Sequence, residues 1–295
     1  MNSRLRGNLM LLLTAFIWGT AFVAQSVGAD FVGPFTFICV RSILGGLVLL
    51  PVIFVLDKAG ITQKPQTRAD KKTLLTGGIC CGAALAIASV VQQMGVERTT
   101  VGKAGFITAL YILIVPMIGL FLKKKVGKLV WIGVGLALVG MYLLCITESF
   151  TIGFGDLLVL ICSFCYSIHI MVIDHFSPKA DGVRLSCIQF FTAAVISGIF
   201  MLLFETPSLE GLRGAAFPIA YAGIMSSGVA YTLQVVAQKD TDPTVASMLM
   251  SLESVFALLA GWVLLNQALS VKEMCGALLV FCAIILAQLP EKKKA

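Results

Sequence analysis

The chain has 295 residues, of which 58% are hydrophobic and 13% are charged, and its mean hydropathy is +0.97. Soluble domains carry roughly 25% charged residues, so this composition excludes an ordinary water-soluble protein and predicts one whose solvent is the lipid bilayer. The formal net charge of +7 requires no nucleic-acid partner, because basic loops orient membrane proteins and face the anionic cytoplasmic leaflet.

Apolar stretches follow one another along almost the whole chain, and a helix needs about 20 mostly apolar residues to cross a bilayer. We predict ten spans, at residues 8–27, 34–56, 73–95, 101–122, 127–146, 155–173, 184–204, 213–237, 243–265 and 272–289. The first stretch follows Arg4 and Arg6, as a signal peptide would, but its apolar run continues to Val27. That length exceeds the usual apolar region of a signal peptide, so we expect a retained first span.

Basic residues concentrate in alternate connections. With a cytoplasmic N-terminus, 17 of the 22 Lys and Arg residues fall on the cytoplasmic side, four fall outside, and Arg41 lies within a span. The positive-inside rule then places both termini in the cytoplasm and predicts an even number of spans. We expect a multi-pass integral protein of a bacterial plasma membrane.

Weak internal similarity relates the two halves of the chain. An offset of 148 residues places Trp18 on Tyr166, and an offset of 142 places Tyr111 on Glu253. We therefore predict two halves of five spans each, and an odd number of spans inverts the second half relative to the first. Inverted repeats commonly build secondary transporters, with the binding site at their interface near the midplane.

The predicted fold class is an all-α integral membrane protein with ten transmembrane helices in two inverted five-helix repeats, at residues 1–148 and 149–295.

Four segments carry a resemblance to a known family: AFIWGTAF at 15–22, GPFTFICVR at 33–41, GDLL at 155–158 and SLESVFALLAGW at 251–262. They resemble signature segments of EamA-type permeases of the drug/metabolite transporter superfamily. With the ten spans, the resemblance covers nearly the whole chain.

The resemblance implies a secondary transporter of small metabolites, namely amino acids, amphipathic metabolites or drugs, which exports or exchanges them by alternating access. The expected partners are a small-molecule substrate, the lipid bilayer and, as a candidate coupling ion, the proton. The size suits a monomer, and the oligomeric state is left open. A membrane-embedded enzyme or a channel is the alternative. We expect no enzyme and no cofactor, because the sequence holds only two histidines and no nucleotide or metal motif.

Polar side chains within lipid-depth helices should face the interior of the bundle. This expectation selects the candidate substrate-binding residues Trp18, Gln25, Gln92, Tyr111, Tyr166, His169, Tyr231, Gln234 and Glu253. Each has a structural alternative. The aromatic residues can serve as packing or interface anchors, the glutamines can bond between helices, and His169 can be a satisfied core group.

Two charged residues lie inside predicted spans. Arg41 is about 10 Å along its helix, so its long side chain can snorkel to the outer interface. Anchoring or pairing is our interpretation, and contact with the substrate is the alternative. Glu253 lies near the middle of its span, where an isolated carboxylate is costly, so it is either protonated or faces a hydrated cavity. A structural hydrogen bond, a polar cavity wall and a proton site are its three candidate roles.

Overall fold

The computed structural model describes residues 3–62, 64–123, 126–145, 153–265 and 270–288, and within these ranges it contains helices and turns but no strand. The predicted boundary between the halves, at residues 148 and 149, lies outside the described residues. The helices in chain order are α1 (Ser3–Ala29), α2 (Pro34–Lys58), α3 (Arg68–Val96), α4 (Val101–Thr108), α5 (Tyr111–Phe121), α6 (Lys128–Cys145), α7 (Phe154–Phe176), α8 (Gly182–Phe204), α9 (Leu209–Gly214), α10 (Ala216–Tyr221), the π-helix η1 (Ala222–Tyr231), α11 (Thr232–Gln238), α12 (Pro243–Met250), α13 (Glu253–Leu265) and α14 (Val271–Gln288).

Eight described segments are long and apolar enough to cross a membrane: Leu5–Ala29, Pro34–Lys58, Arg68–Val96, Val101–Phe121, Phe154–Phe176, Gly182–Phe204, Ala216–Gln238 and Pro243–Leu264. The predicted spans at 127–146 and 272–289 fall on α6 and α14, whose described apolar segments are shorter, Lys128–Gly140 and Met274–Ala283. The chain is therefore a multi-pass membrane protein with eight such segments in its described part.

The outer surface is apolar, unlike that of a soluble protein, and the interior holds many polar side chains beside its apolar core. Large apolar side chains such as Phe121, Leu202 and Phe217 are exposed on the outside of the bundle. Polar side chains, including Gln93, His169 and Ser227, are fully buried. Water would not tolerate such an apolar surface, whereas lipid does and drives the polar groups inward.

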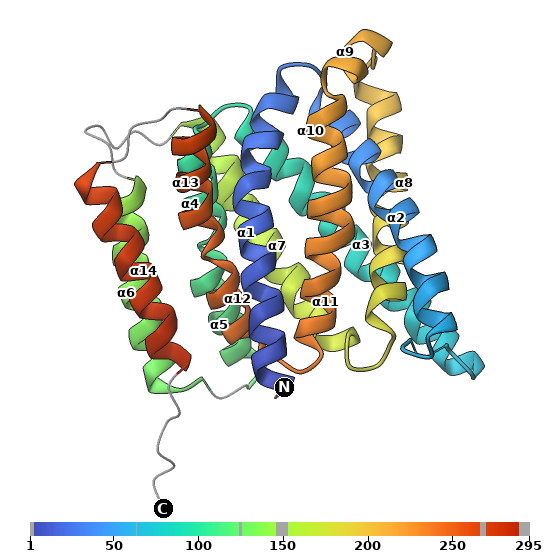
Figure 1. Cartoon of the computed structure of the whole chain (residues 1–295), viewed down its shortest axis with the longest axis horizontal. Coiled ribbons are helices and arrows are strands. Elements are labelled where there is room, and N and C mark those ends of the chain that lie inside the picture. The colour runs from blue at the N-terminus through green and yellow to red at the C-terminus, as the bar shows by residue number, and fades with distance from the viewer. Residues whose placement is uncertain (1–2, 63, 124–125, 146–152, 266–269, 289–295) are drawn as a thin grey trace, which may run out of the picture.

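The helices stand side by side in a single bundle (Figure 1). Helices α6 and α14 pack against each other at one edge, and α2 and α8 pack against each other at the opposite edge. Helix α1 lies in the middle, in contact with α13, η1 and α11, while α3 packs on α7 and α8. The beginning of α1 and the end of α14 lie on the same side of the bundle.

Two spans that the sequence predicted as continuous are each broken into two helices. The span at 101–122 consists of α4 and α5, and the span at 243–265 consists of α12 and α13. At the joins the backbone tightens to i→i−3 hydrogen bonds, from Leu110 N to Ile107 O at 3.2 Å and from Leu252 N to Leu249 O at 3.4 Å. Such tight turns leave some helical carbonyl and amide groups without intrahelical partners.

The span predicted at 213–237 also departs from a regular α-helix. It runs from α10 through η1 into α11, and the ten residues of η1 form a π-helix. Gly223 and Gly228 lie within this wide turn against α2, where a Cβ on Gly223 would lie 3.0 Å from the Arg41 carbonyl oxygen. π-Helical turns are rare and occur frequently at functional sites.

Helices α2 and α8 are fastened to each other at both ends. At one end, the Glu205 carboxylate accepts hydrogen bonds from Phe35 N (2.9 Å), Thr36 N (2.8 Å) and Thr36 Oγ1 (2.6 Å). An anion there satisfies the first free amides of α2 and suits the helix dipole. At the other end, Arg184 of α8 forms an ion pair with Asp57 of α2.

Candidate functional site

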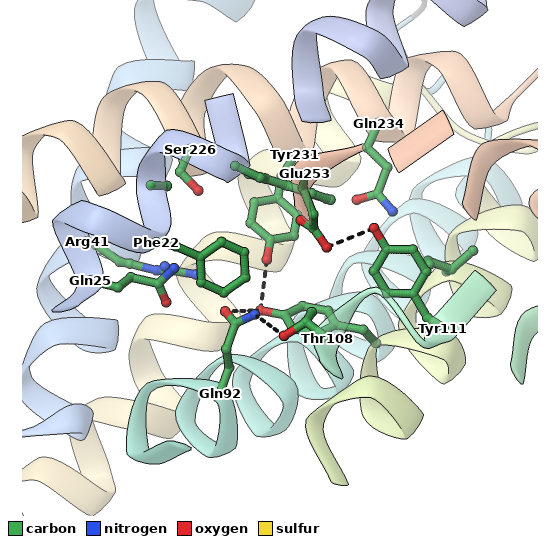
Figure 2. A pocket seen from close by; sticks show the side chains of 14 residues that line it. Phe22, Gln25, Arg41, Gln92, Thr108, Tyr111, Ser226, Tyr231, Gln234 and Glu253 are labelled. Carbon is green, nitrogen blue, oxygen red and sulfur yellow. Dashed lines mark hydrogen bonds between the residues drawn. The ribbon is translucent and has the colours of Figure 1, made fainter. Parts of the chain in front are cut away.

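A small cavity lies inside the bundle, enclosed by side chains from both halves of the chain (Figure 2). Its lining consists of Trp18, Ala21, Phe22, Gln25, Arg41, Gln92, Thr108, Tyr111, Tyr166, Ile170, Ser226, Tyr231, Gln234 and Glu253. The free volume is about 20 Å³, on a measure by which one water molecule needs about 10–15 Å³. In this conformation the cavity has room for water but not for a metabolite.

Eight of the nine predicted site residues line this cavity; His169 does not. His169 is fully buried, and its Nε2 lies 3.1 Å from Gln189 Oε1 on α8. The cavity is therefore where the polar faces of the predicted spans converge. Binding of a substrate by these residues stays a prediction.

The hydroxyl of Tyr166 on α7 is the centre of a hydrogen-bond network in the wall of the cavity. It donates to Gln92 Oε1 (3.1 Å), accepts from Tyr231 Oη (3.0 Å) and lies 3.2 Å from Ser89 Oγ. Gln92 Nε2 in turn donates to Thr108 Oγ1 at 3.3 Å. The network joins α3, α4, α7 and η1, and it fixes the orientation of Gln92 and of both tyrosines.

Glu253 occupies the first position of α13, and its carboxylate meets the first residue of α5. Tyr111 Oη donates a hydrogen bond of 2.8 Å to Glu253 Oε1, and both side chains are buried. The two broken helices thus meet through side chains at their joins (Figure 2). The Glu253 carboxyl has one strong partner and keeps capacity for a further hydrogen bond.

Aromatic rings form one wall of the cavity. Trp18 packs on Tyr231 with a centroid separation of 4.5 Å and an interplanar angle of 53°. The neighbouring Gly19 allows α1 to approach α13 closely, because a Cβ there would lie 2.8 Å from the Glu253 carbonyl oxygen. This approach brings the aromatic wall next to the Glu253 carboxyl.

Several polar atoms of the lining residues are buried without a hydrogen-bond partner among the described residues. They are Trp18 Nε1, Gln25 Oε1, Arg41 Nε, Gln234 Nε2 and Gln234 Oε1. Most buried polar groups in proteins are paired, and leaving one unpaired costs about 1–3 kcal/mol. These five atoms, which include both donors and acceptors, all belong to side chains that line the same cavity, and a polar molecule with both donors and acceptors would pair them.

Eight of the fourteen lining residues form four pairs that are related by the internal offsets. The offset of 148 relates Trp18 to Tyr166 and Phe22 to Ile170, and the offset of 142 relates Tyr111 to Glu253. The offset of 142 also relates Gln92 to Gln234, a pair that the sequence comparison did not single out. Equivalent positions of the two halves therefore face the same cavity.

Arg41 corrects one expectation from the sequence. Its side chain does not snorkel to the interface but is 3% exposed and lines the cavity, with Nη2 donating to Ser89 Oγ at 3.3 Å. Thr108 and Ser226 are further polar lining residues outside the predicted set. The signal for Arg41 was present in the sequence as a cation seven residues inside the predicted span 34–56, but the direction in which it points depends on helix packing.

Two other glutamines have structural roles. Gln93 Nε2 donates to the Gln25 carbonyl oxygen at 3.0 Å, and Gln238 Nε2 donates to the Ile170 carbonyl oxygen at 3.2 Å. These bonds join α3 to α1 and α11 to α7. They show the helix-bonding use of glutamine in a membrane protein, which Gln234, with both amide atoms unpaired, does not share.

Comparison with known proteins gives a consistent result. The model of the EamA-like transporter family matches residues 5–146 and again residues 153–289. A protein of Archaeoglobus fulgidus named "Uncharacterized transporter" is 30% identical over 97% of this chain and 87% of its own length. The transporter YoaV of Bacillus subtilis, also named uncharacterized, is 24% identical over 94% of each chain. A solved crystal structure matches with a TM-score of 0.76 and 18% identity over 96% of both chains, a likeness of fold.

Proposed function

The chain belongs to the EamA-like transporter family and is a membrane transporter, and we propose that it is a secondary transporter that moves small amphipathic metabolites by alternating access. The candidate solutes include amino acids and drug-like metabolites, moved by export or exchange. The observation that carries the proposal is the group of unpaired polar atoms around a cavity shared by both halves. A solute with polar and apolar parts would pair these atoms and pack on the aromatic wall.

The broken helices support the same proposal. Discontinuous spans near the midplane commonly form the substrate and ion sites of secondary transporters, because unwound backbone is tolerated in a membrane only where it is buried in protein or lines a cavity. Here the two joins lie beside the cavity, and each is followed by a polar lining residue, Tyr111 or Glu253. The small free volume suits a closed state that opens to either side in turn.

We further propose that α6 and α14 complete a set of ten spans in two inverted halves, 1–148 and 149–295, with both termini in the cytoplasm. The two separate matches to the family model, the equivalent pairs of lining residues and the 17-to-4 distribution of basic residues support this. Single-cysteine labelling tests the orientation. Cysteines near Asp30, Glu148 and Glu210 should react from outside, and reaction of position 148 from the cytoplasm alone would contradict the topology.

Reconstitution tests the transport function. Purified full-length protein in liposomes should show saturable uptake of radiolabelled metabolites that accelerates when unlabelled solute is present on the opposite side. Trans-acceleration of this kind requires a carrier that alternates its access. An electrical conductance without saturation would indicate a channel, and chemical conversion of the solute would indicate an enzyme.

A further inference from the structure

We propose that Arg41 binds a carboxylate on the transported solute, so that the carrier selects small metabolites with one carboxylate group. This inference rests on the proposed transport function and names the substrate class of the same cavity. Arg41 is 3% exposed, its Nη2 bonds only to the neutral Ser89 Oγ, and its Nε has no acceptor among the described residues.

A guanidinium is charged at every physiological pH, and a buried charge is costly unless it is paired. The described ion pairs join Asp57, Glu97 and Asp156 to basic residues at the ends of the bundle, and none includes Arg41. The counter-charge for Arg41 is therefore not supplied by any carboxylate in the described part of the chain.

Glu253 is the acidic residue of the cavity, yet it lies away from Arg41. Figure 2 shows Arg41 and Gln25 toward one end of the group and Glu253 with Tyr111 toward the other. The Glu253 carboxylate is engaged by the Tyr111 hydroxyl at 2.8 Å. The cavity thus has a cation without an anion, Arg41, at one end. Its carboxyl group, that of Glu253, lies toward the other end.

The second half of the chain shows that the helix packing does not require a cation at this place. The offset of 148 relates α2 to α8 at their first residues, Pro34 and Gly182, and it relates Arg41 to Gln189. Gln189 is also fully buried, and its Oε1 pairs with His169 Nε2 at 3.1 Å. A neutral amide fills the equivalent position, with its Oε1 paired and its Nε2 without a partner among the described residues, so helix packing at this position does not require a charge.

The chemistry of the ligand follows from the charge and from the neighbours of Arg41. Among the described residues that line the cavity, Arg41 is the sole cation, so one negative charge is balanced and a doubly charged phosphate would not be. The planar fork of a guanidinium matches a carboxylate with two parallel hydrogen bonds. The ring of Phe22, which lies near Arg41 in Figure 2, suits an apolar body.

Matched solutes that differ only at the carboxylate test the inference. The probes are radiolabelled 3-phenylpropionate, L-phenylalanine and L-leucine, each beside its carboxamide, with phenethylamine as a cation, measured by counterflow in proteoliposomes. The variants are Arg41→Gln and Arg41→Lys. The control is Arg98→Gln, which changes an exposed arginine paired with Glu97 outside the cavity. Elution as a single species verifies the fold of each variant.

We expect wild type and Arg98→Gln to prefer the carboxylates over their carboxamides. Arg41→Gln should lose about 10- to 150-fold in apparent affinity for the carboxylates, the effect of one hydrogen-bonded charge. Arg41→Lys should keep the preference with weaker affinity because it keeps the charge without the fork. If Arg41→Gln does not fold, two other results test the inference: the preference of wild type for carboxylates over carboxamides, and a weaker affinity of Arg41→Lys for the carboxylates.

Equal transport of carboxamides or of phenethylamine by wild type would overturn the inference while transport itself stands. An unchanged preference for carboxylates in Arg41→Gln would overturn it in the same way. Absence of flux for every probe in the wild-type protein would overturn the proposed function together with the inference.

Discussion

The two broken spans share a backbone design and differ in their chemistry. Helices α4 and α12 are each eight residues long, and each is capped by a side chain, Thr100 or Asp242, at the offset of 142. Each join is followed directly by a buried polar residue that lines the cavity. In the first half this residue is Tyr111, which is a hydrogen-bond donor, and in the second half it is Glu253, which is its acceptor.

This difference shows that two breaks with the same backbone form can differ in their chemistry. The backbone breaks occur in both halves, so they belong to the architecture. Among the described residues that line the cavity, the carboxyl group occurs in one half only. The same reasoning applies to Arg41 and Gln189, where the first half carries the charge. The guanidinium of Arg41 and the carboxyl of Glu253 thus lie at positions whose equivalents, Gln189 and Tyr111, carry neither group.

The largest expected effect comes from separating α1 from the second break. Gly19→Val would place a Cβ 2.8 Å from both Ala257 N and the Glu253 carbonyl oxygen, and overpacking of this kind costs about 1–3 kcal/mol or more. We expect a lower thermal midpoint in detergent and little folded protein. Gly135→Val is the control, because nothing lies within 4 Å of a Cβ at Gly135. Equal midpoints for the two variants would show that the close approach of α1 and α13 is unimportant.

Substitution of Glu253 tests whether the chemical difference between the breaks has a function. Glu253→Gln keeps the shape and an oxygen acceptor for Tyr111 but removes the titrating group. If Glu253 carries protons, uphill accumulation should fall at least about tenfold while exchange continues, and the pH dependence of uphill flux should disappear. If Glu253 only contacts the solute, affinity should change without an altered pH dependence.

The same measurement distinguishes a purely structural role of Glu253 from the proton-carrying and solute-contacting roles. Glu253→Leu leaves the buried Tyr111 hydroxyl without its acceptor, at a cost of about 1–3 kcal/mol, and we expect reduced expression. Wild-type uphill flux in Glu253→Gln together with poor expression of Glu253→Leu would assign Glu253 to the structure alone. The comparison between the two breaks would then concern stability and not transport.

An intermediate effect is expected from the aromatic wall, which the two halves share. Trp18→Ala removes the ring that packs on Tyr231, and truncation of a buried aromatic contact residue commonly costs 2 kcal/mol or more of binding, roughly a 30-fold loss. We expect lower apparent affinity in counterflow with a folded, inserted protein. Phe16→Ala, on the exposed side of α1, is the control. Wild-type kinetics in Trp18→Ala and Tyr231→Ala alike would place the site elsewhere.

The smallest effect is expected from Tyr111→Phe in the state in which the Glu253 carboxyl is protonated. This change removes one hydroxyl from the join of the first half and leaves the ring in place. The hydrogen bond to Glu253 is charge-assisted when the carboxyl is ionised, and its loss should cost about 1.5–3 kcal/mol in that state and about 1 kcal/mol when the carboxyl is protonated. Thermal midpoints at low and high pH distinguish the two states. No difference between wild type and variant at either pH would show that the two joins are not coupled.

Much of the arrangement follows from the sequence because lipid imposes a simple rule on polar side chains. The polar faces of the predicted spans converge on one cavity, and eight of the nine predicted residues line it. His169 departs because a neighbouring helix offers Gln189 as its partner. A single sequence cannot show which partner an inward polar residue will find, because that depends on how neighbouring helices are rotated.

The helix breaks were not predictable from composition. The joins at Ala109–Leu110 and Ser251–Leu252 contain neither glycine nor proline, which are the usual signals of a broken helix. Conversely, Pro51 and Pro116 lie within continuous helices. The local sequence at the joins therefore gives no signal for the breaks, and each join is followed by a polar residue that bonds to its counterpart across the bundle.

The fastening of α2 to α8 has a mechanical consequence. Glu205 binds the first turn of α2 at one end, and Asp57 pairs with Arg184 at the other. Because α2 and α8 are bonded to each other at both ends, we expect them to move as one rigid pair. Relative motion in the bundle is then expected at the borders of this pair and not between its two helices. Arg41 lies on α2, within this rigid pair. Its guanidinium would therefore keep a fixed position while the helices on the opposite side of the cavity shift.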